Sequence, residues 1–256
     1  MDEYIYRYIS FETFVGMIQS QALTFVQPML WEDPQESSPF RQFIEGLHNE
    51  WEQLVFTACY FKTFGQCWTR LSESDAMWRI YSYNKKAIRV KIKKDAFLLL
   101  DNVDAIDVTY QDTVFEYQDE KDIKKDYIRA LCQKRIAFQH EQEIRLIHHY
   151  RFLNDEDFDR HVKAVMAISD HPQKMEALKS LFPDLTIEEQ VDKTCRLLNV
   201  GKNKQAAKNI SFTHIPDFIC GVMIHPQADD WYVKVVEEFC RINNVPFEGK
   251  SKLYSK

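Results

Sequence analysis

The stretch YIYRYISFETFVGMIQSQALTFVQP (residues 4–28) indicates a β-strand, an α-helix and a second β-strand in quick succession. The alternating tyrosines and isoleucines of residues 4–9 favour a strand. Ser10 is a residue type that caps helix N-termini, so we expect a helix over residues 11–20. The segment ALTFVQP (22–28) is typical of a second strand, which Pro28 would end.

Outward from this stretch, strands and helices intermix without regular alternation. Such an order favours an α+β fold over a doubly wound parallel sheet. We therefore predict a single α+β domain over residues 1–256, with a helical insertion at about 155–199 between strand-rich parts. Further strands are expected at 55–61, 66–72, 87–92, 105–110 and 143–150 and on either side of Pro216, and further helices at 40–55, within 72–83, at 119–138 and at 229–243.

Glycine is scarce in this chain of 256 residues, which contains 6 Gly against 18 Phe, 12 Tyr and 5 Trp. Neither G-x-G-x-x-G nor G-x-x-x-x-G-K-[ST] occurs, so the glycine-rich backbone loops that usually bind nucleotide phosphates are absent. A nucleotide, if one is bound, must be held by side chains. The apolar share of 45% predicts a well-formed core, and the charged share of 28% predicts a polar surface.

Neither a membrane span nor a signal segment is expected. No apolar run approaches the ~18 residues of a transmembrane helix, and the start of the chain, MDEYIYRYIS, has acidic rather than basic flanks. The six cysteines form no C-x-x-C pair, and no Cys or His pair has strong zinc-ligand spacing. We therefore predict reduced thiols, no bound metal and a cytoplasmic protein without membrane contact.

Arg7 is the first candidate functional residue. In a strand, Ile5, Arg7 and Ile9 share one face, so the guanidinium is expected to be at least partly buried. A buried guanidinium is unfavourable unless it meets an anion. Arg7 is therefore either a structural ion-pair or edge residue, or a clamp on a phosphate or carboxylate ligand, for which its planar fork is suited.

The segment FQHEQEIRLI (138–147) carries the second candidate group. On a strand, Glu141, Glu143 and Arg145 would point the same way, with the two carboxylates roughly 6–7 Å apart. Such a pair could stabilise a developing cation, act as acid and base, or hold a metal. The alternative is a solvated charged face on which Arg145 pairs with a glutamate.

The segment CWTRLSESDAMWRIYSY (67–83) combines hydroxyls with aromatic rings around a strand-to-helix junction. Thr69 or Ser72 could orient a catalytic group, while Trp78 or Tyr81 could stack on a flat ligand ring. Helix capping and core packing are the alternative for all of them.

Further charged segments admit two interpretations each. Asp33 and Glu36 in the loop WEDPQE (31–36) either cap a helix or contact a ligand. The basic stretches at 85–94 and 193–216 either contact phosphates or an acidic partner, or form a solvated face.

The order of these motifs resembles a bacterial family that is often encoded near toxin–antitoxin or phage-defence genes. The matching motifs are YRY (6–8), DP-x-E (33–36), MW-x-x-Y (77–81) and F-x-x-E-x-E-I-R (138–145). The same arrangement is similar to the Arg–Ser–Glu branch of the ADP-ribosyltransferase superfamily. The resemblance departs in the middle motif, because CWTRLSES only loosely matches the S-T-S of that branch.

This resemblance implies a split, mostly antiparallel β-sandwich with flanking helices, and NAD as the substrate. Arg7 would hold the NAD phosphates, with Tyr8 beside it, and Thr69 or Ser72 would supply the supporting hydroxyl. Trp78 or Tyr81 would pack on the nicotinamide. Glu143 would be the catalytic carboxylate, and Glu141 its partner. A toxin or phage-defence effector of this kind would modify RNA, DNA or protein, and an antitoxin protein could bind it.

Two functions of other classes stay open. A metal-dependent nuclease could use Asp33, Glu36, Glu141 and Glu143 as ligands, and its activity would vanish with a chelator. A non-catalytic binding or sensor module would not bind NAD, and Arg7→Ala would then affect only stability.

Overall fold

The computed structural model describes residues 3–31, 33, 36, 38–46, 63–82, 84–113, 116, 123–148 and 206–254. The strand predicted at 55–61 and the helical insertion predicted at about 155–199 lie outside the described residues. The same holds for the second half of the helix predicted at 40–55 and for most of the basic stretch at 193–216.

The opening stretch folds as predicted. Strand β1 (Tyr4–Ile9) is followed by helix α1 (Phe11–Ser20) and strand β2 (Ala22–Val26). The hydroxyl of Ser10 accepts a hydrogen bond from the backbone N–H of Thr13 at 3.1 Å, which is the capping contact that its position predicts. The later elements are η1 (Pro28–Leu30), α2 (Ser38–Gly46), β3 (Phe64–Thr69), α4 (Asp75–Tyr81), β4 (Ile88–Lys93), η3 (Lys94–Leu99), β5 (Val103–Asp107), β6 (Thr109–Tyr110), α5 (Ile123–Leu131), β7 (Gln133–Lys134), η4 (Ile136–Glu141), β8 (Glu143–His148), β9 (Ala207–Ser211), α9 (Ile215–Phe218), β10 (Ile219–Ile224), α10 (Asp230–Ile242) and β11 (Phe247–Lys250).

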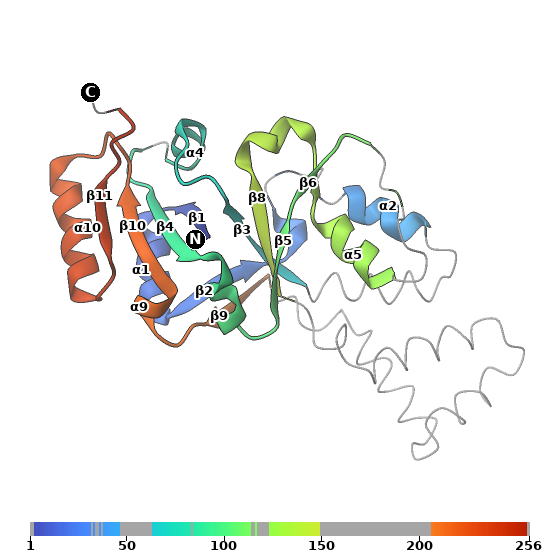
Figure 1. Ribbon diagram of the computed structural model, residues 1–256, viewed down its shortest axis with the longest axis horizontal. Coiled ribbons are helices and arrows are strands. Elements are labelled where there is room, and N and C mark those ends of the chain that lie inside the picture. The colour runs from blue at the N-terminus through green and yellow to red at the C-terminus, as the bar shows by residue number, and fades with distance from the viewer. Residues whose placement is uncertain are drawn as a thin grey trace, which may run out of the picture.

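The strands form one large, mainly antiparallel sheet, which confirms the α+β class (Figure 1). Its order is β11-β10-β4-β1-β3-β2-β9, and β8 pairs with β3 on one side and β5 on the other. Among the strands that the structure describes in this sheet, β10 and β11 run parallel and the other pairs are antiparallel. Strands β6 and β7 form a separate parallel pair.

The sheet divides between β1 and β3 into one half with β11, β10, β4 and β1 and another with β3, β2, β9, β8 and β5. Backbone pairing between these two halves is sparse. Strand β1 pairs with β4 along its whole length, and β3 pairs with β8 along its whole length. Between β1 and β3, in contrast, the only registered pair is Tyr6 opposite Thr69. The strands therefore come apart on either side of this pair, which leaves room for side chains from both halves to meet.

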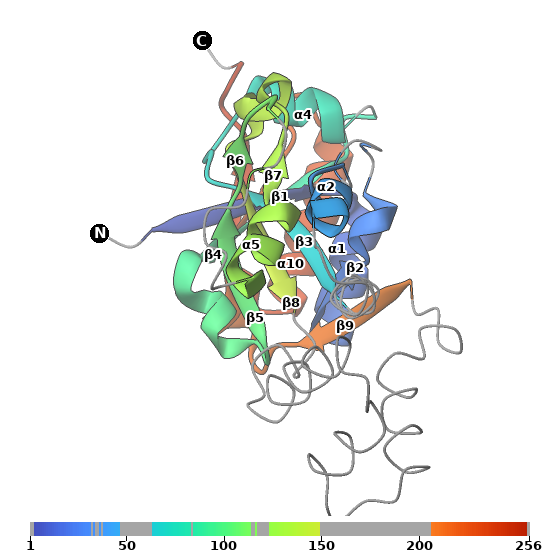
Figure 2. The ribbon, with the colours of Figure 1, turned by 90° about the vertical axis from the view of Figure 1, so that its right-hand side faces the viewer.

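Helices cover the two halves separately. Helices α1 and α10 lie beside β1, β4 and β10, where their buried residues join the main hydrophobic core (Figure 1). Helices α2 and α5 lie side by side in front of β3 and β8 (Figure 2). Phe40 and Phe43 of α2 meet the ring of Tyr127 of α5, both at centroid distances of 5.9 Å. No helix among the described residues is long and apolar enough to cross a membrane.

The helix predicted at 119–138 is wrong in its second half, because α5 ends at Leu131. The next residues pair with β6 instead: the carbonyl of Cys132 accepts from the Thr109 N–H at 2.8 Å, and the carbonyl of Lys134 accepts from the Gln111 N–H at 2.9 Å. A long-range strand pairing thus overrides the local helical pattern. It places Lys134 on a strand, where its side chain contacts Glu141 and Glu143 of the E-x-E segment (141–143).

Candidate functional site

A pocket of about 100 Å³ lies where β1 and β3 come apart. It brings together six of the eight residues that the sequence singled out for NAD binding and catalysis: Arg7, Tyr8, Thr69, Tyr81, Glu141 and Glu143. Four further residues complete its lining: Tyr6, Cys67, Trp68 and Met77. The lining comes from β1, β3, α4, η4 and β8, so segments far apart in the sequence build one site.

Arg7 is a half-buried cation without a partner in the described part of the chain. Its neighbours on the same face of β1, Ile5 and Ile9, belong to the hydrophobic core. No hydrogen bond or ion pair of Arg7 is found among the described residues, although the guanidinium lines a pocket that also contains two carboxylates. Burial lowers the pKa of Arg7, because a low-dielectric environment disfavours the charged guanidinium. An anionic ligand group would supply the missing partner.

Thr69 is the hydroxyl that reaches the carboxylate segment. Its Oγ1 is buried, donates to the carbonyl oxygen of Glu141 at 2.5 Å and accepts from the N–H of Leu71 at 3.1 Å. Ser72 is exposed, does not line the pocket, and contributes its carbonyl oxygen to a hydrogen bond from Arg89. The middle motif therefore holds the backbone of the E-x-E segment through Thr69.

Glu143 is buried and bound by two cations. Its Oε1 lies 2.8 Å from Arg145 Nε, and its Oε2 lies 3.1 Å from Lys134 Nζ. Burial opposes ionisation, but the two cations outweigh it and lower the pKa of Glu143 to about 2. The backbone N–H of Glu143 donates to the hydroxyl of Tyr110 at 2.7 Å, which fixes the start of β8. Glu143 is therefore a carboxylate that stays ionised in a buried position.

Glu141 does not lie on the strand, contrary to the extended spacing that the sequence suggested. It ends the 3-10 helix η4, and Gln142 at φ 42° turns the chain before β8 begins. The carboxylates of Glu141 and Glu143 nevertheless converge, because Lys134 Nζ lies 2.7 Å from the first and 3.1 Å from the second. The left-handed turn at Gln142 thus brings the two carboxylates to the same side, as the extended strand was expected to do.

Behind the pocket, Arg145 and Lys134 join Glu143 to a third buried carboxylate. Arg145 Nη2 lies 2.9 Å from Glu36, Lys134 Nζ lies 3.0 Å from Glu36, and Trp31 lies over the guanidinium at 4.0 Å. Burial raises the pKa of Glu36 and outweighs the opposite effect of Arg145 and Lys134, and the nearby Glu143 raises it further. The expected pairing of Arg145 with a glutamate is present, but in a fully buried network rather than on a solvated face. Sequence reasoning missed Lys134 because it assigned that residue to a helix.

Of the two aromatic candidates in α4, Tyr81 lines the pocket and Trp78 does not. Tyr81 is 39% exposed and is stacked beside Tyr8, with ring centroids 6.5 Å apart. Trp78 is fully buried, packs edge-on against Tyr8 at 4.7 Å and donates its Nε1–H to Glu73. Tyr81 is thus the ring that a planar ligand can contact, whereas Trp78 is a core residue that packs against Tyr8.

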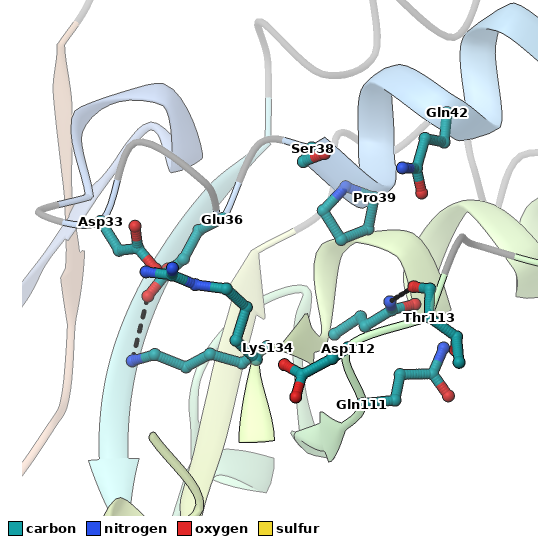
Figure 3. Close-up of a pocket in the computed structure, with 11 residues that line it drawn as sticks. Asp33, Glu36, Ser38, Pro39, Gln42, Gln111, Asp112, Thr113 and Lys134 are labelled. Carbon is teal, nitrogen blue, oxygen red and sulfur yellow. Dashed lines mark hydrogen bonds and ion pairs between the residues drawn. The ribbon is translucent and has the colours of Figure 1, made fainter. Parts of the chain in front are cut away.

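A second pocket of about 200 Å³ lies on the other side of the charged network (Figure 3). Asp33, Glu36 and Lys134 line it together with Arg135, which pairs with Asp33 at 2.9 Å. The network of Glu36 and Lys134 therefore separates this pocket from the one that contains Arg7. Among the described residues, no group of three or more His, Cys, Asp and Glu side chains is arranged to hold a metal ion.

Glu143 also lines a wider surface hollow of about 540 Å³. Tyr110, Arg70 and His140 belong to this hollow, but not to the pocket of Arg7. Glu143 thus lies between these two spaces and lines both of them.

No protein-family model matches the sequence. Among curated proteins no significant sequence match was found, and among solved structures no significant structural match was found. The function must therefore be argued from the chemistry of the pocket itself.

Proposed function

We propose that this protein is an NAD-dependent ADP-ribosyltransferase that modifies a macromolecule. The observation that carries the proposal is a pocket in which three groups meet: an arginine without an ion-pair partner in the described part of the chain, a partly exposed tyrosine ring and an ionised glutamate. NAD offers a chemical counterpart to each of them: a pyrophosphate, a planar nicotinamide and a ribose that becomes positively charged during reaction. The resemblance of the sequence implies a split sandwich, and the single pair between β1 and β3 would be the place where the sheet divides.

Binding would use the cation of Arg7 and the partly exposed ring of Tyr81. Arg7 would donate two parallel hydrogen bonds to the pyrophosphate, and Tyr81 would stack on the nicotinamide. A pocket of about 100 Å³ is smaller than the roughly 300–1,000 Å³ of sites that enclose a whole ligand. It therefore suits the reacting end of NAD, while the rest of the dinucleotide would lie along the surface.

The reaction would break the bond between the nicotinamide nitrogen and the ribose carbon C1′, and the electron pair would leave with nicotinamide. Glu143 would hydrogen-bond the ribose 2′-hydroxyl and stabilise the oxocarbenium-like ribose by its negative charge. Glu141 would take the proton of the acceptor nucleophile as that group bonds to C1′. Thr69 would keep Glu141 in place through its hydrogen bond to the Glu141 carbonyl.

The acceptor is proposed to be RNA, DNA or a protein in the cytoplasm, as in the toxin and phage-defence effectors that the sequence resembles. It could approach Glu143 from the wider hollow beside Tyr110, on the side away from Arg7. An antitoxin protein is the partner that such an effector would require. The chemistry of the carboxylates favours this function over a nuclease, since the ammonium group of Lys134 contacts Glu36, Glu141 and Glu143 where a metal ion would have to bind.

The test is incubation with NAD labelled on its adenylate phosphate, together with a bacterial lysate that is then separated into RNA, DNA and protein. We expect label on one fraction and release of nicotinamide, both unaffected by a chelator. Glu143→Gln should lower the rate by about 10²–10⁴-fold, because it removes the charge that stabilises the ribose cation. The matched control is Glu238→Gln on the exposed helix α10, which should keep full activity.

Three outcomes would contradict the proposal. Full NAD turnover by Glu143→Gln would remove this residue from the reaction. Activity on nucleic acid that a chelator abolishes would favour the nuclease. The absence of any NAD binding by the wild-type chain would favour a non-catalytic binding module.

A further inference from the structure

Lys134 is a buried cation that touches three carboxylates at once. Its ammonium lies 2.7 Å from Glu141, 3.0 Å from Glu36 and 3.1 Å from Glu143, and its side chain is 8% exposed. Burial opposes the charge of an ammonium, yet the three carboxylates raise the pKa of Lys134 above its ordinary value. Lys134 therefore stays charged, and it is the one cation that contacts both members of the E-x-E pair within the described residues.

The fold holds this ammonium in place through backbone and ring contacts. Lys134 ends the two-residue strand β7, and its carbonyl accepts from the Gln111 N–H at 2.9 Å. Its Nζ lies 4.7 Å from the centre of the Phe138 ring, a cation–π distance. A side chain so fixed is unlike a surface lysine that happens to lie near a carboxylate.

The charges of the network leave a surplus. Glu36, Glu141 and Glu143 supply three carboxylates, and Lys134 and Arg145 supply two cations. Two carboxylates that share one site raise each other's pKa unless a cation lies between them. Lys134 supplies that cation, and Glu36 adds a further carboxylate. Counted by formal charge, the network therefore has one more negative group than positive groups.

We propose that Lys134 is a positioning residue that holds the carboxylates of Glu141 and Glu143 together and keeps Glu143 ionised, and that Glu36 supplies the further carboxylate by which the acidic groups of the network outnumber its cations. The catalytic meaning of this proposal rests on the proposed function, because only a positively charged transition state benefits from the surplus. The charge-setting role itself is a property of the protein alone and can be measured without NAD.

The decisive measurement is the titration of the Glu143 carboxyl carbon by NMR in protein labelled on glutamate, with the signal assigned from Glu143→Gln. In the wild type we expect no titration of Glu143 between about pH 3 and pH 8, in line with its pKa of about 2. In Lys134→Met the midpoint should move upward by about one to three pH units and enter this range. Lys134→Arg keeps the charge and should restore the wild-type behaviour.

The other titratable or charged groups that face Glu143 do not change in these variants. Cys67, Tyr81 and Arg7 lie at the pocket, and Tyr110, Arg70, Asp107 and His140 lie across the wider hollow. Arg145, Glu36 and Glu141 belong to the buried network itself. A difference between Lys134→Met and Lys134→Arg is therefore assigned to the charge at position 134.

Glu36→Gln provides a second test with the opposite sign. It removes a negative charge but keeps an oxygen that can accept from Lys134, so the Glu143 titration should stay at or below the wild-type midpoint. With NAD, this variant should lose about 10-fold or more in kcat with little change in KM, because the surplus charge acts on the transition state rather than on binding.

A Glu143 midpoint in folded Lys134→Met that equals the wild-type value would overturn the proposal, and so would a midpoint that rises in Glu36→Gln. If Lys134→Met does not fold, the Glu36→Gln titration decides. Inactivity of the wild type with NAD, combined with the expected titrations, would refute the proposed function and leave the charge-setting role in place.

Discussion

Arg7 and Arg145 lie on the two halves of the same sheet, and their surroundings are opposite. Arg145, on β8, is fully buried and meets Glu36, Glu143 and the carbonyl oxygen of Leu131, with the Trp31 ring above it. Arg7, on β1, is half buried and has no partner among the described residues. Glu36 and Glu143 neutralise the guanidinium of Arg145, whereas no carboxylate of the described segments pairs with that of Arg7.

The difference separates stability from ligand binding. A buried charge that the chain itself neutralises holds elements together, here the segment before α2 and strand β8. A charge held near apolar neighbours without an anion lowers stability and is retained for what it binds. The comparison therefore predicts that equivalent substitutions of the two arginines have different consequences.

The largest effect is expected from Arg145→Met. It leaves Glu36 and Glu143 buried with Lys134 as their remaining cation, so the free energy of unfolding should fall by about 3–5 kcal/mol. Denaturant unfolding measures it, with Arg241→Met on the exposed face of α10 as the control. A loss no greater than that of Arg7→Met would end the distinction between the two arginines.

The second prediction concerns the pH dependence of stability and tests Glu143, which pairs with Arg145. The pKa of Glu143 is about 2 in the folded protein and near 4.5 otherwise, so its ionised form stabilises the fold above about pH 4.5. This contribution, about 3 kcal/mol, should be lost as the pH falls from 4.5 toward 2. Unfolding curves at successive pH values measure it. In Glu143→Gln this part of the pH dependence should disappear, and an unchanged slope would contradict the assignment.

The third prediction concerns binding. Arg7→Met should weaken NAD binding by about 10- to 100-fold, the range expected when a charge-assisted hydrogen bond to a phosphate is lost. The stability of the folded protein should stay unchanged or rise, because the unpartnered cation is removed. Calorimetric titration and denaturant unfolding of the same samples test both statements. A variant that unfolds more easily and binds NAD normally would make Arg7 a structural residue.

Local patterns predicted much of the fold, and tertiary pairing determined the rest. The opening strand–helix–strand unit and the final helix agree with prediction because their periodicity and caps lie within a few residues. The end of α5 could not be read in this way, since the residues after Leu131 pair with β6, which lies more than twenty positions earlier. On both sides of Pro216 the predicted strands are present, with the short helix α9 between them.

The pocket residues also divide into those that local patterns predicted and those that tertiary pairing determined. Arg7, Thr69, Tyr81 and Glu143 stood out as polar or aromatic groups in strand or helix patterns, and all four line the pocket. The hydroxyl choice between Thr69 and Ser72 depended on which side chain faces β8, and spacing alone did not determine that. The contact of Lys134 with the E-x-E pair follows from a strand of two residues, which is too short to leave a periodic signal.

The single pair between Tyr6 and Thr69 has a mechanical consequence. A full ladder of backbone hydrogen bonds resists rotation of one strand against its neighbour, whereas a single pair resists such rotation much less. At this place the two halves are therefore held together mainly by side chains, since one hydrophobic core contains Ile5 and Val90 from one half and Trp68 and Ile144 from the other. The position of the pocket between β1 and β3 thus depends on side-chain packing in this core.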